Sequence, residues 1–547
     1  MRRRDRRAGA KVEPSGAVAP ATPLTISRLW LVLSLLVILM VVAVRIRLLN
    51  VPLERDEGEY AYTGQLMLQG VPPYRLAANM KLPGTHVAYA LIMAVFGQTT
   101  AGIHVGFLLV NLGAVMLVFL LGRRLLDLNG GLAAAASYAL LSLGAGVYGT
   151  SAHATQFVVL PALGGTLLLL QWTESRRSLH LFASGLLYGI AFLMKQPGIL
   201  FAVFGGLYLI WMGRKELATG AGRLAARLGI FAAAAALPFG VTCLILWRAG
   251  VFANFWFWTV SYGRQYGTMA SFADGTRSFL RVFPTVLEPD WGIWILAAGG
   301  LGMAWWKKER RDFARFASAL LLCSCVAASI GLYFRGHYFV LLLPAVALLV
   351  GACVAGLGGV AGRTLPLLLF AGAVLWSVAG QQDFMFELNP IQVSRRLYWP
   401  NPFPEAVQIA DYLQPHSNPN ARVAVLGSEP EIYFYSRRHS ASSFLYTYGL
   451  MEPQPYALEM QEQMIRDIEA VRPEFVITVG NAESWLKQPA SSTRLIDWWS
   501  VYGQEHYLLE GVVDMIAPDR VECRWGAAAA SYSPRSSDLL LVVRRKP

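Results

Sequence analysis

The sequence predicts a mainly α-helical protein that crosses a membrane many times and ends in a small α/β domain. Of its 547 residues, 55% are hydrophobic and only 15% are charged, whereas a soluble protein has about 25% charged residues. Apolar runs of about 20 residues, long enough for a helix to cross a bilayer, recur over most of the chain. After residue 380 these runs stop, and short apolar segments alternate with polar sequence.

About eleven apolar segments qualify as membrane spans. Basic residues gather in every second loop between them, and the positive-inside rule puts those loops in the cytoplasm. The chain then divides into a basic cytoplasmic tail (1–26), a membrane domain (27–380) and an outer domain (381–547) of a protein of the plasma (inner) membrane, with two long outer loops, 48–100 and 248–290. The predicted spans are approximately 27–47, 102–122, 131–149, 155–172, 180–195, 198–213, 228–247, 291–306, 314–333, 338–357 and 364–380.

The net charge of +13 does not indicate a nucleic-acid-binding protein. The positive residues lie in short loops between apolar spans, and no basic face with interleaved aromatic residues is evident outside them. The five cysteines have neither a disulfide nor a zinc-site spacing.

The segment after residue 380 has the patterns of a water-soluble α/β domain. EAVQIADYL has helical period, and ARVAVLGS, PEFVITVG and LLLVVRR are short β-rich runs. Strands that alternate with helices predict a small sheet covered by helices. Within this domain GSEPEIYFYSRR, residues 427–438, is predicted as a strand end followed by a helix. Acceptor binding and docking onto the membrane domain are both open for it.

The stretch ERDEGEYAY, residues 54–62, concentrates four acids directly after the first predicted span. Crowded carboxylates repel one another and need a cation, a proton or water nearby. A lone Lys81 follows in a turn of Pro and Gly, on the same outer side. Acids and a lysine held beside one membrane surface suit an anionic, lipid-linked substrate. The alternative is a solvated loop, with no chemical task.

Several stretches of the chain resemble the protein-O-mannosyltransferase superfamily, glycosyltransferase family 39. RDEGEYAYTGQLMLQGVPPY, followed by KLPG, resembles its first outer loop, and SAHATQFVVLPAL, MKQPGILF and GHYFVLLLPAVALL follow in the family's order. The resemblance covers about residues 27–450 and implies a GT-C-type membrane enzyme. Such enzymes transfer a sugar from a polyprenyl-phosphate donor to an acceptor hydroxyl on the outer face, with inversion.

The resemblance implies roles for three residues of the first outer loop. Asp56 matches the family's catalytic aspartate, Glu57 its partner, and Lys81 the lysine that contacts the donor phosphate. A carboxylate within hydrogen-bond reach can take the proton of the acceptor hydroxyl, so Asp56 is the expected general base. A cation at the leaving phosphate stabilises the charge that develops there.

Two arginines are further candidates for the donor phosphate: Arg335 in YFRGHYF and Arg264 in SYGRQYG of the second outer loop. For each, the alternative is an arginine that snorkels to the membrane interface. The weaker candidates for the wall of the substrate cavity are Tyr60, Tyr74, His153 and His337.

No cofactor is certain from the sequence, but a divalent metal ion that bridges the acids and the phosphate stays open. Some relatives have an acidic residue just before the matching lysine, where this chain has Met80. His86 and His337 are candidate ligands, and a purely structural, hydrogen-bonded histidine is the alternative for each.

Two other functions are alternatives to the enzyme: a secondary transporter and a non-catalytic envelope assembly protein. The partners of the enzyme would be a polyprenyl-phosphate-linked sugar and a glycolipid, glycan or protein acceptor.

The remaining acids and the aromatic run also have expected roles. Glu54 and Glu59 are expected on a helix face, with no direct chemical task. The aromatic run FANFWFW, residues 252–258, is expected to form an interfacial belt, with a floor for sugar or lipid as its alternative.

Overall fold

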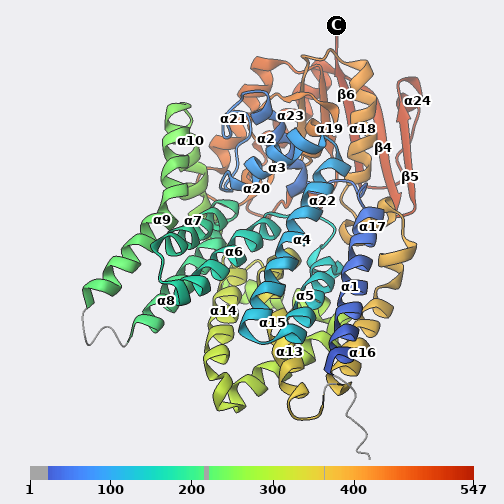
Figure 1. The fold of residues 1–547 in the computed structure, drawn as a ribbon. Helices are drawn as coiled ribbons and strands as arrows, with labels where there is room; N and C mark the ends of the chain where they lie inside the picture. The colour runs from blue at the N-terminus through green and yellow to red at the C-terminus, as the bar shows by residue number, and fades with distance from the viewer. Residues whose placement is uncertain (1–22, 215–220, 363) are drawn as a thin grey trace, which may run out of the picture.

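The computed structural model describes residues 23–214, 221–362 and 364–547. Most of the predicted cytoplasmic tail and Lys215 of an inner loop lie outside these residues. A long bundle of helices forms the lower part of the molecule, and a sheet with its covering helices forms the upper part, where the C-terminus lies (Figure 1).

Eleven described helices overlap the eleven predicted spans. A helix satisfies its own backbone hydrogen bonds, so apolar segments can fold this way in lipid. Seven described helices are long and apolar enough to cross a membrane, which confirms a multi-pass helical protein, while the count of eleven stays a prediction. The eleven helices are α1 (Pro23–Arg47), α4 (Thr100–Leu125), α5 (Leu128–Leu143), α6 (Ala154–Ser175), α7 (Ser178–Met194), α8 (Ile199–Gly213), α9 (Ala221–Arg248), α13 (Trp291–Trp306), α14 (Arg311–Ser329), α15 (Leu343–Gly358) and α16 (Thr364–Gly380).

Short helical turns close the ends of several of these helices. The 3₁₀ turns are η1 (Ala145–Val147), η2 (Gln196–Gly198), η4 (Glu288–Asp290), η5 (Lys308–Arg310) and η6 (Gly336–Leu342). Gly336 is required where η6 crosses η1, because a Cβ atom there would lie 2.3 Å from the carbonyl oxygen of Gly146. This close approach brings the α5–α6 and α14–α15 connections together.

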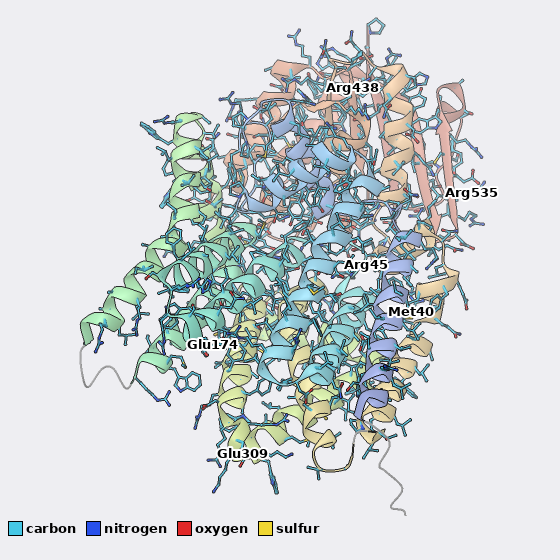
Figure 2. The ribbon with its side chains drawn as sticks, in the orientation of Figure 1. Met40, Arg45, Glu174, Glu309, Arg438 and Arg535 are labelled. Atoms are coloured by element: carbon cyan, nitrogen blue, oxygen red, sulfur yellow. The ribbon has the colours of Figure 1, made fainter. Side chains whose placement is uncertain are left out.

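The last turn of α1 is anchored by buried arginine. Arg45 is labelled on α1 in Figure 2, and its guanidinium donates hydrogen bonds to the carbonyl oxygens of Gly149 (2.6 Å) and Ser142 (2.9 Å). A buried charge in a membrane helix needs such partners. The bonds hold the end of α1, and therefore the start of the acidic stretch, against the α5–α6 connection.

The first outer loop folds into two helices, α2 (Arg55–Leu68) and α3 (Gly84–Phe96). Glu54 begins α2 as its N-cap: its side chain accepts from the backbone N–H of Glu57, and the Glu57 side chain accepts from that of Glu54. The prediction that Glu54 lies on a helix face is therefore wrong, because its carboxylate closes the end of the helix.

The second outer loop is mostly helical. It contains α10 (Phe252–Trp256), the π-helix η3 (Phe257–Tyr262), α11 (Gly263–Gly267) and α12 (Phe272–Leu287). Phe255 is buried with its ring 5.4 Å from that of Tyr74, and Trp258 lies 6.0 Å from Phe444 of the C-terminal domain. The aromatic run thus fastens the loop to the rest of the protein, and the expectation of a simple interfacial belt is wrong for these two rings.

The C-terminal part is an α/β domain, as predicted. Its six-stranded sheet has the order β2-β1-β3-β6-β4-β5, parallel among β2, β1 and β3 and antiparallel elsewhere. The strands are β1 (Arg422–Leu426), β2 (His439–Ser440), β3 (Phe475–Val479), β4 (Tyr507–Ala517), β5 (Arg520–Trp525) and β6 (Leu539–Arg545). The helices are η7 (Asp383–Glu387), α17 (Pro390–Tyr398), α18 (Phe403–His416), α19 (Glu431–Ser436), α20 (Tyr448–Met451), α21 (Ala457–Val471), α22 (Ala482–Trp485), α23 (Arg494–His506) and α24 (Ala527–Ala530).

The two faces of the sheet pack in different directions. In β1, Val423 and Val425 belong to a core that includes Tyr60 and Tyr62 of α2, whereas Ala424 and Leu426 pack with residues of α21 and α23. Alternate side chains of a strand point to opposite faces, so one face of the sheet faces α2. The hydrophobic core is therefore continuous from the sheet into the first outer loop.

The segment 427–438 makes a close contact with the first outer loop. A Cβ atom on Gly58 would lie 2.6 Å from Cβ of Glu431, so only glycine lets α2 and α19 approach so closely. Arg55 reinforces the contact through an ion pair with Glu429 at 3.1 Å. Of the two predicted roles for this segment, docking is the one these contacts support.

Candidate functional site

The four acids of the first outer loop point in different directions from the first turns of α2. Glu54 caps the helix, and Asp56 is the most exposed of the four, with 18% of its side chain accessible. Glu57 and Glu59 are fully buried. Asp56 and Glu59 are three residues apart and share a face of α2, whereas Glu57 follows Asp56 directly and faces another side. The acidic stretch is therefore divided among separate partners.

Lys81 joins two of these acids. Its ammonium nitrogen lies 2.8 Å from Oδ1 of Asp56 and 3.0 Å from Oε2 of Glu59. It also lies 4.4 Å from the centre of the Tyr60 ring, a cation–π contact. The structure thus brings together Asp56, Lys81 and Tyr60, three of the residues that the sequence proposed for the site. It also gives Glu59 an ion-pair partner, and the expectation that Glu59 has no direct chemical task stays a prediction.

The backbone of Lys81 is fixed by its own loop. Its N–H donates to Oδ1 of Asn79 (2.7 Å), and its carbonyl oxygen accepts from the Tyr74 hydroxyl (2.7 Å). Tyr74 is 2% exposed and has a left-handed backbone (φ 67°). Tyr74, predicted at the cavity wall, instead shapes the turn that holds Lys81.

The electrostatic setting keeps Asp56 ionised. Burial opposes the charge on Asp56, but Lys81, His153 and Arg335 together lower the pKa of its carboxyl. The pKa of Glu59 is also lowered, since burial is outweighed by Lys81 and His86. Both carboxylates therefore carry negative charge near pH 7, and Lys81 neutralises part of it.

Glu57 has a different task from the one the sequence predicted. Its Oε1 accepts hydrogen bonds from Nε2 of His104 (3.0 Å) and from the backbone N–H of Ala152 (2.7 Å). Because Glu57 is 0% exposed, its carboxylate has no open side for a substrate. The bond to Ala152 holds the loop before α6 against α2, so Glu57 acts as a positioning residue.

Two histidines from separate loops stack beside Asp56. His153 precedes α6 and His337 lies in η6, and their rings are 4.0 Å apart with an angle of 12°. The Thr155 hydroxyl donates to the carbonyl oxygen of His337 (2.8 Å) and ties the two loops together. Burial lowers the pKa of His153 to about 4, so its ring is neutral at pH 7.

Two more cations face the same acids. Arg335 follows α14, and its charge contributes to the lowered pKa of Asp56. Lys195 lies in the turn between α7 and η2, with its ammonium 4.1 Å from the centre of the Tyr338 ring. Burial lowers the pKa of Lys195 to about 7 despite the opposing effect of Asp56. Lys81, Lys195 and Arg335 thus form a cationic group around Asp56.

The C-terminal domain contributes aromatic side chains to this site. The Tyr446 and Tyr448 rings stack 5.9 Å apart, and the Tyr446 hydroxyl donates to the carbonyl oxygen of Arg55 (3.2 Å). The ammonium of Lys81 lies 5.6 Å from the Tyr446 ring. The site is therefore walled partly by a domain that is distant in sequence.

Arg264 is the candidate that the structure does not bring to this group. It is exposed on α11, and within the described parts of the chain no ion pair or hydrogen bond joins its side chain to the acids. Tyr266, two residues on, stacks instead on Tyr333 next to Arg335. The interface alternative fits Arg264 better.

Sequence reasoning missed Lys195, His104 and the Tyr446–Tyr448 pair. A signal was available for Lys195, since MKQPGILF has a lone lysine just before Pro and Gly, as KLPG has for Lys81. His104 lies inside α4, and the tyrosines lie past the last membrane span, so nothing local links them to Asp56.

Known proteins share this architecture. The family model described as dolichyl-phosphate-mannose-protein mannosyltransferase matches residues 81–261. The crystal structure of ArnT from Cupriavidus metallidurans bound to undecaprenyl phosphate matches with a TM-score of 0.61 at 16% identity, over 94% of this chain and 97% of that chain. The chain has a GT-C fold.

A second structure agrees with this GT-C fold. ArnT from the same organism in the apo state matches with a TM-score of 0.58 at 14% identity, again over 94% of this chain and 97% of that one. No curated protein matches the chain in sequence. The likeness thus extends along nearly the whole chain and includes the C-terminal domain, although the identity is low.

Proposed function

We propose that this GT-C chain is a membrane glycosyltransferase that moves a sugar from a polyprenyl-phosphate donor to an acceptor hydroxyl on the outer face. The observation that carries the proposal is the Asp56–Lys81 pair, with Lys195 and Arg335 facing the same carboxylate. One negatively charged base among several cations suits a reaction in which a phosphate leaves. The N-terminus would be cytoplasmic and the C-terminal domain periplasmic.

In the proposed reaction Asp56 takes the proton of the acceptor hydroxyl. The hydroxyl oxygen forms a bond to the anomeric carbon as the bond from that carbon to the phosphate oxygen breaks. Attack from the opposite side inverts the configuration, and polyprenyl phosphate leaves with the electron pair. The products are the glycosylated acceptor, the lipid phosphate and a proton on Asp56.

The cations have a double role in this proposal. While Lys81 pairs with Asp56, it lowers the basicity of that carboxylate. A donor phosphate would compete with Asp56 for Lys81, and the carboxylate would become a stronger base as the donor binds. Charge that develops on the leaving phosphate strengthens the same contacts in the transition state. Donor binding would thus prepare the base.

Lys195 gives this site a pH dependence. With a pKa of about 7, Lys195 loses its charge as the pH rises through neutrality. The donor phosphodiester keeps one negative charge over this range, so we expect its KM to rise above about pH 7. Lys195→Arg stays protonated and should flatten this rise. The control is Lys487→Arg, the same substitution at an exposed lysine. If the donor KM depends on pH identically in wild type and Lys195→Arg, Lys195 does not bind the donor phosphate.

The proposal is tested by mass spectrometry of envelope glycolipids, glycans and glycoproteins from cells with and without the gene. We expect one class of acceptor to lose the mass of one sugar when the gene is deleted, and to regain it on complementation. This mass difference also identifies the sugar and the acceptor. Unchanged glycan masses, with the substrate of a transporter accumulating on one side of the membrane, would favour the transporter alternative.

A further inference from the structure

The stacked pair His153–His337 has no use in the proton transfer described above. Each ring comes from its own loop, and both are buried, with exposures of 2% and 4%. The two rings and the Asp56 carboxylate offer three ligand atoms that lie within 4.8 Å of one another. Two imidazoles and one carboxylate are a common set of metal ligands.

Three of the four ring nitrogens of this pair lack a hydrogen-bond partner. Nδ1 and Nε2 of His153 and Nδ1 of His337 are buried without a hydrogen bond. Nδ1 of His153 lies 3.3 Å from Oε1 of Glu54, but the two are not oriented for a hydrogen bond. By contrast, both ring nitrogens of nearby His104 have partners. Burying polar atoms without partners is costly, and these nitrogens are free to bind a ligand.

We propose that Asp56, His153 and His337 bind one divalent transition-metal ion of the zinc class. Imidazole nitrogen favours such ions over Mg²⁺ and Ca²⁺, which prefer oxygen ligands. Zinc–nitrogen bonds of about 2.0–2.1 Å put tetrahedral ligand atoms about 3.4 Å apart. Small side-chain rotations would therefore bring the three ligand atoms to this spacing, and a fourth position would stay open.

The local charge balance accommodates such an ion. Lys81, Lys195 and Arg335 face the cluster with positive charge, and Asp56, Glu57 and Glu59 oppose them. Glu54 lies next to His153, with its Oε1 3.3 Å from Nδ1 of that ring. Its side chain would help to orient the His153 ring toward the ion.

The proposed ligands differ from the candidates expected from the sequence, which were His86 and His337. His86 is not part of it, because Nε2 of His86 is held 2.6 Å from Oε1 of Glu59. Any effect of the metal on catalysis rests on the proposed glycosyl transfer. An acceptor hydroxyl at the open position would become more acidic, while Asp56 as a ligand would become less basic, so both changes act on the same proton.

The test is zinc binding by the purified full-length protein. The protein carries an affinity tag without histidine, is stripped with a chelator, and is titrated with Zn²⁺ in detergent. We expect one equivalent bound by wild type and at least about tenfold weaker binding by His153→Ala and His337→Ala. The control is His180→Ala. The His180 ring is half-buried, bonds Ser175 and lies roughly 20 Å from Lys195 along α7.

A second measurement needs no variant, in case the alanine proteins fail to fold. X-ray absorption at the zinc edge of wild type should show scattering from two imidazole rings. Absence of imidazole scattering, no zinc above the stripped background, or equal binding by wild type and both folded variants would overturn the site. Zinc binding at these residues without glycosyl transfer would contradict only the proposed function. Transfer by a protein that binds no zinc would contradict only the metal site.

Discussion

Replacing Asp56 with Asn abolishes glycosyl transfer and leaves the protein folded. The amide keeps the shape of the side chain and an oxygen that accepts from Lys81, which now lies 2.8 Å away. It cannot take a proton from the acceptor hydroxyl. Since a positioned general base contributes about 10²–10⁴-fold to rate, we expect a loss of at least that size in kcat. The measurement is product formation in membranes, with expression and thermal unfolding followed in parallel.

The matched control is Asp519→Asn, the same substitution in the exposed turn between β4 and β5. It should have wild-type activity. Substantial transfer by a folded Asp56→Asn protein would remove Asp56 as the base and, with it, the central step of the mechanism. Because Asp56 is also a proposed metal ligand, zinc binding by this variant should be measured alongside. The histidine variants then separate the two roles.

Replacing Lys81 with Ala weakens use of the donor. Lys81 is the cation closest to Asp56 and Glu59, and the proposed donor phosphate would bind in its place beside them. A hydrogen bond to a charged group is worth about 1.5–3 kcal/mol, so we expect kcat/KM for the donor to fall by roughly 10–100-fold. The fall should appear mainly in KM if the contact forms in the ground state, and in kcat if it strengthens in the transition state.

Two comparisons make this second experiment decisive. Lys487→Ala removes an exposed lysine and should have no effect. Lys81→Arg keeps the charge and should recover part of the activity, although its planar guanidinium bonds differently from an ammonium. If Lys81→Ala folds and its dependence on donor concentration is unchanged, Lys81 does not contact the phosphate.

For the four acids of the first outer loop, the sequence predicted their position but not their partners. Their position beside the first membrane span was evident, because an apolar run of this length predicts a helix and the acids follow it at once. Their tasks were not evident from the sequence, because each task depends on a partner that is distant along the chain. Glu57 meets His104 and Ala152, and Glu59 meets Lys81 and His86.

In the C-terminal domain, too, only some of the strands could be predicted from the sequence. Strands β1, β3 and β6 were predicted because each is a short, strongly apolar run between polar segments. The hairpin of β4 and β5 was not predicted, because its strands, YLLEGVVDMIA and RVECRW, mix charged with apolar residues. Pairing of β4 with β6 stabilises this hairpin, and no local pattern encodes such pairing.

The sequence by itself determined a multi-pass helical chain, an α/β domain at its end, and an acidic stretch with a lysine nearby. These follow from the periods and lengths of local segments, which hydrophobic burial dictates. Only the tertiary structure decided that Lys195, His153, His337 and Arg335 surround Asp56. These four residues come from three separate connections between helices. Their meeting depends on how the helices pack, including the glycine contact between η1 and η6, and packing joins residues that no local pattern relates.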